Sequence, residues 1–155
     1  MGQSMISYLI RKATPEDLPV LVELSAEHAE FEQVEYSPLG KADRLHEHFF
    51  GTPPSAFCLV AEVDQTLAGY ATYSKEFSTW DAGFYIHMDC LYLRPSFRGY
   101  GIGEELINQI REDARGLGCN LIQWQTPKFN TRAIKFYERI GAKQKEKVRF
   151  YLNVD

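Results

Sequence analysis

Three glycines at alternate positions, in the segment Arg98-Gly-Tyr-Gly-Ile-Gly103, constrain the fold of this chain more than any other feature. The segment follows an apolar, strand-like stretch at residues 84–93 and precedes a helix-like stretch that begins at Glu104. Glycines let a backbone approach a ligand closely, and the first N–H groups of a helix point at that ligand together with the positive end of the helix dipole. The pattern predicts a turn that binds an anionic group; a turn without a ligand is the less favoured alternative.

Two other glycine-rich turns are excluded by their surroundings. A nucleoside-triphosphate loop needs Gly-Lys-Ser/Thr after its last glycine, whereas Gly103 is followed by Glu104 and Glu105. A dinucleotide fold needs its turn near the start of a strand-helix series and an acid about 20 residues later, at the end of a second strand. Asp113 and Asn120 do not supply that acid, and the turn comes late in the chain.

The arrangement Arg-x-x-Gly-x-Gly after a strand resembles the acyl-CoA signature of the GNAT superfamily of N-acetyltransferases. The chain looks closest to the diamine (spermidine/spermine) N-acetyltransferase branch, and residues 58–63, 89–93, 97–103 and 130–142 carry this resemblance. It implies acetyl-CoA as co-substrate and an α+β GNAT fold. That fold has a mixed, mostly antiparallel central sheet with helices on both faces and a splayed parallel strand pair, between which the acyl chain enters.

Size and composition predict one soluble domain. A chain of 155 residues with 45% apolar content can fill one core, so we expect a single GNAT acetyltransferase domain over residues 1–155. The net charge of −4, with both signs mixed, argues against a nucleic-acid partner and suits a small cationic substrate. No apolar run approaches the roughly 20 residues that span a bilayer, so we expect no membrane partner and a cytoplasmic location.

The cysteines and histidines do not indicate a metal site. Cys58, Cys90 and Cys119 include no Cys-x-x-Cys pair, and the four histidines have no metal-ligand spacing. We therefore expect no metal and no disulfide. Cys58 and Cys90 lie in apolar strand patterns, where a free cysteine is usually a small buried hydrophobe.

Hydrophobic periodicity and the residues that begin helices predict the order of helices and strands. Helix starts are indicated by Thr14-Pro15 with its following acids, and by Asn130. We expect strands at residues 7–12, 56–63, 67–78, 84–93, 121–125 and 148–154, and helices at 15–29, 41–50, 102–117 and 131–140. Because the helix after the glycine turn is a crossover, the strands at 84–93 and 121–125 should be parallel.

Acetyl transfer from a thioester requires groups that hold the co-substrate, deliver a neutral amine, stabilise the oxyanion and protonate the leaving thiolate. The turn amides are expected to hold the pyrophosphate, with Arg98 adding charge. The resemblance implies that the backbone of the preceding strand pairs with the pantetheine arm and supplies an oxyanion donor. The expected cofactor-binding residues are Leu91, Tyr92, Leu93, Arg98, Gly99, Tyr100, Gly101, Ile102, Gly103, Glu104, Asn130 and Ala133.

Tyr137 is the expected general acid. The superfamily carries its thiolate-protonating tyrosine in Phe-Tyr-Glu-Arg-x-Gly-Ala, which stands here at residues 136–142, and Asn130 matches its asparagine that contacts the CoA arm. Tyr137 follows Asn130 by seven positions, two helical turns, so both should face the same side with Ala133 and Ile134. The alternative is a tyrosine packed on the sheet with its hydroxyl bonded to a carbonyl.

Asp89 is the second catalytic candidate. Period two would place it with His87 on one strand face, and Met88 with Cys90 on the other. A carboxylate inside an apolar strand is costly without a partner. Amine recognition, base catalysis directly or through water, and a structural pairing all stay open; Glu62 and His87 are alternative bases. The diamine branch carries Glu here, and Asp is shorter.

Phe31 and Glu32 match an aromatic-acid pair that lines the polyamine channel in that branch. Glu27, Glu30 and Glu35 add negative charge nearby, although a solvated helix end has the same composition. The resemblance further implies a homodimer, because a terminal strand, here at residues 149–154, often packs across a two-fold partner.

The expected function is acetyl-CoA-dependent transfer of an acetyl group, by direct attack, to a small primary amine that is a polyamine, a diamine or lysine-like. Two alternatives stay open. The first is acetylation of a protein N-terminus or lysine, and the second is a non-catalytic acyl-CoA-binding module.

Overall fold

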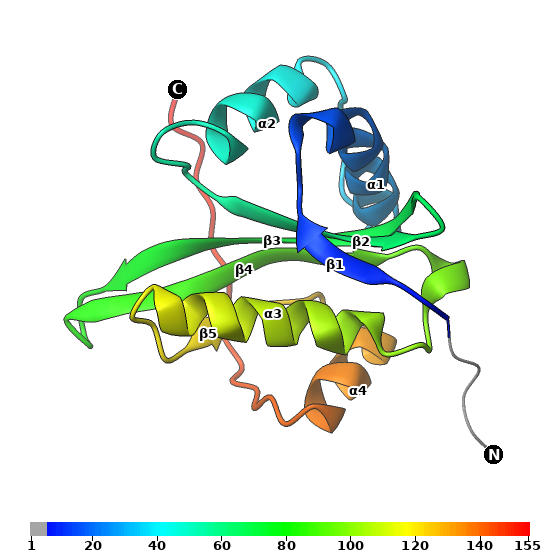
Figure 1. Ribbon diagram of the computed structural model, residues 1–155. Coiled ribbons are helices and arrows are strands. Elements are labelled where there is room, and N and C mark those ends of the chain that lie inside the picture. The colour runs from blue at the N-terminus through cyan, green and yellow to red at the C-terminus, as the bar shows by residue number, and fades with distance from the viewer. Residues whose placement is uncertain (1–5) are drawn as a thin grey trace. The chain divides into compact units, whose positions relative to one another are not determined.

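The computed structural model describes residues 6–155, and a five-stranded sheet organises this part of the chain (Figure 1). The strands follow each other across the sheet in chain order: β1 (Leu9–Lys12), β2 (Phe57–Val63), β3 (Thr66–Ser78), β4 (Gly83–Leu93) and β5 (Ile122–Gln123). The helices are α1 (Leu18–Phe31), α2 (Lys41–Phe49), α3 (Ile102–Gly116) and α4 (Thr131–Arg139), with 3-10 turns at Pro15–Asp17 and Pro95–Phe97. β1 to β4 pair antiparallel, and β5 pairs with β4 in parallel, as predicted.

The chain divides after Gln125 into two compact units. The first holds the sheet with α1, α2 and α3. The second, Thr126–Asp155, holds α4 and the C-terminal tail.

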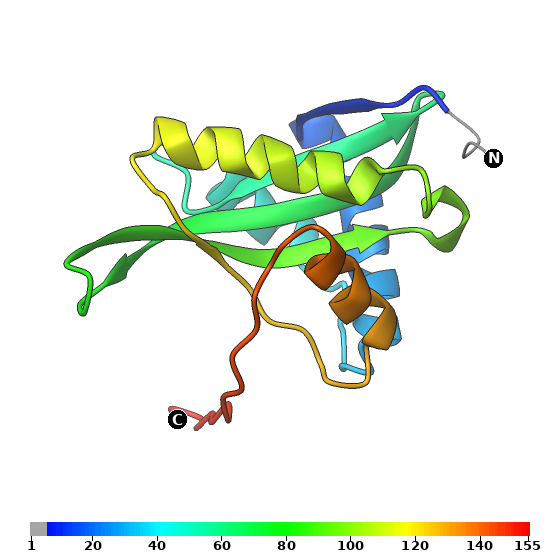
Figure 2. The same cartoon turned by 90° about the horizontal axis from the view of Figure 1, so that it is seen from below.

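Helices cover both faces of the sheet in the first unit, which confirms the predicted layering. α1 and α2 lie over one face, and α3 lies over the other, as the view from below shows (Figures 1 and 2). On the α1 side, Leu21 and Leu24 pack in one cluster with Val60, Tyr70 and Tyr92. Burying one such leucine contributes about 1.5–3 kcal/mol. On α3 the buried residues recur at helical spacing: Ile102, Gly103, Leu106, Ile107, Ile110 and Ala114.

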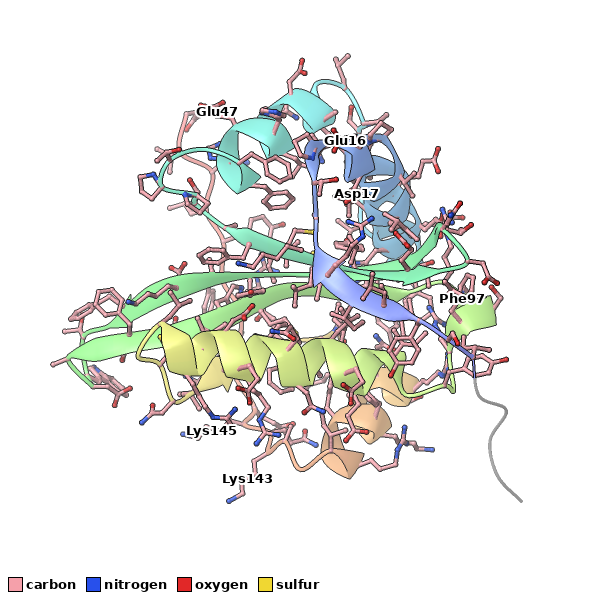
Figure 3. All side chains as sticks on the ribbon, in the orientation of Figure 1. Glu16, Asp17, Glu47, Phe97, Lys143 and Lys145 are labelled. Atoms are coloured by element: carbon pink, nitrogen blue, oxygen red, sulfur yellow. The ribbon has the colours of Figure 1, made fainter. Side chains whose placement is uncertain are left out.

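The start of α1 is fixed by an ion-pair cluster around Asp17, which Figure 3 labels. Its carboxylate accepts hydrogen bonds from the Arg11 guanidinium at 2.8 and 2.9 Å and from the Thr14 backbone N–H at 2.7 Å. The Arg11 hydrogen bond lowers the pKa of Asp17 below its ordinary value. Arg11 also reaches Glu62 at 3.0 Å. Glu62, an alternative base in the sequence analysis, is therefore held in a structural ion pair.

A β-bulge at Asp89 overturns the predicted alternation along β4. Tyr73 pairs with Met88 and Thr72 pairs with Cys90, so Asp89 is the extra residue of the bulge. Cys90 consequently packs against the cluster under α1, whereas Met88 lies opposite Tyr73, whose hydroxyl donates to Asp113 of α3. Met88 and Cys90 thus face opposite sides of the sheet. The sequence carries no mark of a bulge, because period two assumes an unbroken ladder.

The parallel pair is short. β5 spans two residues rather than the predicted 121–125, and it pairs Ile122 with Ile86 and Gln123 with His87. β4 continues to Leu93 beyond this pairing.

The predicted final strand at residues 148–154 is wrong. Residues 142–155 form no regular secondary structure, and Val148, Phe150 and Leu152 are 78%, 87% and 90% exposed. Alternating apolar residues favour a strand when a sheet edge accepts their backbone groups. Within the described residues, the tail pairs with no strand of the sheet.

Candidate active site

The glycine turn ahead of α3 has the geometry of a backbone cradle. Gly99 and Gly101 adopt φ of 89° and 83°, in the left-handed region that favours glycine. A Cβ built at either position meets no atom of the described chain within 4 Å, so the space beside this backbone is open. Gly101 is the N-cap of α3, whose first N–H groups have no partner inside the helix. The residues fit a pyrophosphate on the end of a fifteen-residue helix.

Arg98 joins this turn to the neighbouring elements of the first unit. Its Nε donates to the carbonyl of Leu93 at 2.9 Å. Its guanidinium lies over the rings of Phe31 and Tyr92, at 5.3 and 5.6 Å from their centroids. These contacts hold Arg98 between the end of β4 and the end of α1, and they connect the turn with Phe31, one of the two predicted substrate residues.

The three predicted cofactor-binding residues at the end of β4 differ in their burial. Tyr92 is buried toward α1, and its hydroxyl donates to Glu27 at 3.2 Å. Burial, followed by the charge of Glu27, raises the pKa of Tyr92. Leu91 and Leu93 are partly buried and pair with Ala71 and Gly69 of β3.

Glu27 and Arg94 form a charge pair that the sequence analysis did not foresee. Arg94 approaches Glu27 to 3.0 Å, and it lies 3.7 Å from Glu23. The hydrogen bond to Glu27 raises the pKa of Arg94. Because Arg94 neutralises Glu27, this carboxylate contributes less negative charge to the region than expected.

Phe31 and Glu32 lie at the end of α1, which runs two residues beyond its predicted end. Phe31 is 43% exposed and lies beneath Arg98. Glu32 is the C-cap of α1, and its Oε2 is 2.7 Å from Nε2 of His28. The two predicted substrate residues thus share one helix end. Sequence reasoning missed His28, although its i, i+4 spacing to Glu32 is a signal that could have found it.

Asp89 is solvent-facing rather than buried. Its side chain is 72% exposed, and its Oδ1 lies 3.8 Å from Nε2 of His87. The bulge turns the carboxylate outward, so the desolvation cost that suggested a structural partner does not arise. The thiol of Cys90 lies 3.7 Å from Oδ2 of Asp89, and burial raises the pKa of this thiol to about 11. The prediction of a buried cysteine is confirmed for Cys58, whereas Cys90 is only partly buried.

The second unit contains Asn130, Ala133 and Tyr137. Asn130 caps α4 as predicted: its side chain accepts from the backbone N–H of Ala133 at 3.3 Å and donates to Thr126 at 3.2 Å. Tyr137 and Ala133 belong to the less exposed face of α4, and the Tyr137 ring centroid lies 5.3 Å from that of Phe136. Gly141, at φ 95°, follows the helix.

No group of three or more His, Cys, Asp and Glu side chains among residues 6–155 is arranged to hold a metal ion.

Comparison with known proteins decides the family. The model of the acetyltransferase (GNAT) family matches residues 21–142, which is most of the chain. This chain belongs to the GNAT acetyltransferase family. The superfamily resemblance read from the glycine turn and the Tyr137 motif is confirmed, and with it the fold class and the assignment as an acetyltransferase.

Curated relatives lie in the predicted branch. The thialysine N-epsilon-acetyltransferase of Sus scrofa is 31% identical over 147 residues, covering 90% of this chain and 86% of that protein. The Caenorhabditis elegans protein of the same name is 30% identical and covers 88% and 83%. The spermidine/spermine N(1)-acetyltransferase-like protein 1 of Homo sapiens is 29% identical over 92% of this chain and 21% of its own length.

Solved structures agree on the fold. An integron cassette protein from the mobile metagenome of V. cholerae aligns with a TM-score of 0.76 at 27% identity, covering 96% of this chain and 94% of its own. An aminoglycoside acetyltransferase from an uncultured soil metagenomic sample aligns with a TM-score of 0.80 at 17% identity, covering 96% and 97%. The second likeness concerns the fold alone.

Proposed function

We propose that this GNAT member transfers an acetyl group from acetyl-CoA to a primary amine of a small cationic molecule: a polyamine, a diamine or a lysine-like compound. The contact that carries the proposal is Arg98 over Phe31, 5.3 Å from the ring centroid, because it joins the glycine turn to the acidic end of α1. The activities that name the relatives, thialysine and spermidine/spermine acetylation, support the same substrate class.

The co-substrate would be held by main-chain groups of this chain. The amides of residues 99–104 would bind its pyrophosphate, with the Arg98 side chain adding charge, since the Arg98 N–H donates to the Pro95 carbonyl at 3.2 Å. The backbone of residues 91–93 would align its pantetheine arm. When bound, acetyl-CoA supplies an activated thioester, so this chain need not form a covalent intermediate of its own. Amides at the end of β4 are the proposed donors to the developing oxyanion.

Proton transfers are assigned to two side chains. Asp89, exposed at the bulge with His87 at 3.8 Å, would accept the proton of the substrate ammonium, directly or through water. Tyr137 would protonate the leaving thiolate, and Asn130 and Ala133, at the start of its helix, are further proposed co-substrate residues. Together these two side chains would supply the substrate amine in its neutral form and release CoA as a protonated thiol.

The two compact units are proposed to act as one domain over residues 1–155, since the family match runs from residue 21 to residue 142 and so includes parts of both. We further propose a homodimer through the exposed apolar tail. No helix within residues 6–155 has the length and apolar character needed to cross a membrane. A cytoplasmic location completes the proposal.

Free-thiol release from acetyl-CoA tests the function. The panel comprises spermidine, putrescine, thialysine, lysine and a peptide N-terminus, with an amine-free control. Turnover restricted to small di- and polyamines or lysine analogues is expected. Preference for the peptide would replace this proposal with protein acetylation, and co-substrate binding without turnover would favour a binding module.

A further inference from the structure

One histidine holds the carboxylate of Glu32. His28 lies one turn before Glu32 on α1, and its Nε2 is 2.7 Å from Oε2. The His28 side chain is 13% exposed and that of Glu32 is 27% exposed. A hydrogen bond this short, between a nearly buried ring and a partly exposed carboxylate, fixes the direction in which the carboxylate points.

The ring of His28 is itself held from two sides. Its Nδ1 is 3.1 Å from the hydroxyl of Tyr70, and its plane stacks on Tyr92 at 5.3 Å between centroids and 20° between planes. Tyr70 also meets the ring edge to face at 6.1 Å. Tyr70 and Tyr92 are both buried on the sheet. The imidazole therefore has little freedom to rotate, and Nε2 stays aimed at Glu32.

The polar partners select one tautomer of the neutral ring. A carboxylate accepts hydrogen bonds, so Nε2 carries the hydrogen that faces Glu32, and in the neutral ring Nδ1 accepts from the hydroxyl of Tyr70. In this neutral form the imidazole orients the carboxylate without cancelling its charge. Glu27 on the same helix is different, because Arg94 approaches it to 3.0 Å and neutralises it.

A carboxylate with an intact charge stabilises the charged form of any amine that it holds. The amine that attacks a thioester must be neutral. Glu32 therefore suits the end of the substrate that does not react.

We propose that His28 is a positioning residue, which orients Glu32 to bind the second, non-reacting ammonium group of a substrate with two cationic ends. The inference rests on the proposed function and narrows its substrate class. Molecules with a second ammonium gain this contact, and monoamines of similar length do not.

Steady-state kinetics with putrescine and butylamine test the inference. His28→Ala should raise the KM for putrescine about tenfold, which corresponds to one hydrogen bond to a charged group. The kcat, the KM for acetyl-CoA and the KM for butylamine should change less than about twofold. His28→Gln places an amide nitrogen near the position of Nε2 and should restore most of the putrescine KM, whereas His28→Asn, which mimics Nδ1, should not. His46→Ala, on the exposed face of α2, is the matched control.

A double-mutant cycle separates positioning from packing. Glu32→Gln should raise the putrescine KM at least as much as His28→Ala, and the double variant should show no further rise. Additive losses, an equal rise for butylamine, or equal rescue by Gln and Asn would overturn the positioning role. If His28→Ala does not fold, the comparison of Gln with Asn carries the test.

Failure of the proposed function and failure of the inference about His28 would give different results. Wild-type protein that neither turns over nor binds any amine in calorimetry would overturn the proposed function, and the inference with it. Wild-type turnover with a putrescine KM indifferent to His28 would overturn the inference alone.

Discussion

Gly69 of β3 lies so close to Tyr92 of β4 that a Cβ on Gly69 would be 2.2 Å from the Tyr92 carbonyl oxygen. The obstructing atom is backbone, so the strand itself would have to move. Gly69→Ala should lower the free energy of unfolding by about 1–3 kcal/mol, the range for overpacked sites. Urea denaturation measures this. Gly116→Ala, in α3 with open space around it, is the control and should be neutral or stabilising by about 0.5–1 kcal/mol; equal effects would contradict the packing argument.

Gly101→Ala tests the cradle of the glycine turn. At φ 83° an alanine costs about 1–2 kcal/mol of backbone strain, and the turn would relax at the α3 N-cap. We expect the Kd for acetyl-CoA to rise about tenfold, measured by calorimetry, and the melting temperature to fall by about 2–8 °C, as the strain requires. A loss of stability with unchanged acetyl-CoA affinity would show that the turn is structural.

Tyr137→Phe tests the general acid. Removing the hydroxyl should lower the rate of thiol release by about 100-fold, the low end for general acid–base catalysis. The Kd for acetyl-CoA should stay within about twofold. Tyr151→Phe in the exposed tail is the matched control. If both rate and affinity fall together, the hydroxyl holds the co-substrate rather than protonating the thiolate.

The Asp17 ion pair predicts a pH dependence of stability. Its folded pKa is depressed by Arg11, so its contribution is present above the unfolded pKa of about 3.9 and is lost as the pH falls through the lower folded pKa. Asp17→Asn should therefore destabilise the fold at pH 7 by about 1–3 kcal/mol, and the difference should shrink below about pH 4. Urea denaturation of the wild type and of Asp17→Asn between pH 3 and pH 7 measures this difference in unfolding free energy. Glu16→Gln, at an exposed position, is the control. A pH-independent difference would assign the loss to packing.

The tail predicts the assembly state. Phe150 and Leu152 are 87% and 90% exposed in one chain, and a second copy is proposed to cover them. Replacing both by Ser should convert a dimer to a monomer in light scattering. The monomer should keep its helical circular dichroism, because residues 142–155 have no regular structure. A dimer that survives both substitutions would exclude the tail as its contact.

The sequence predicted those parts of the fold that depend on local pattern. The turn at Gly99 and Gly101, the buried face of α3 and the cap at Asn130 each follow from residues close in the chain. The errors concern pairing between strands. The bulge at Asp89 and the unpaired tail depend on which edges the sheet offers, and a period of two contains no information about them.

In the candidate site, too, local motifs were predictable from the sequence, and contacts between distant segments were not. Phe31, Glu32 and Arg98 were predicted from motifs and stay predictions as site residues, and the contact between Phe31 and Arg98 appeared once the chain was folded. The contacts of His28 with Tyr70 and of Arg94 with Glu27 were not predicted, because each joins residues far apart in the chain. The pairing of His28 with Glu32 was a local signal that the motif reading did not use.

The bulge at Asp89 affects which deletions β4 can tolerate during evolution. Removing Asp89 would leave Met88 opposite Tyr73 and Cys90 opposite Thr72, because these pairs already flank it. Every neighbouring side chain would keep its face, so the hydrogen-bond ladder does not demand a residue here. Folding alone would permit its deletion during evolution. A shortened strand would lose the local bend and one outward carboxylate, so any need for residue 89 lies in those two features and not in the pairing of the strands.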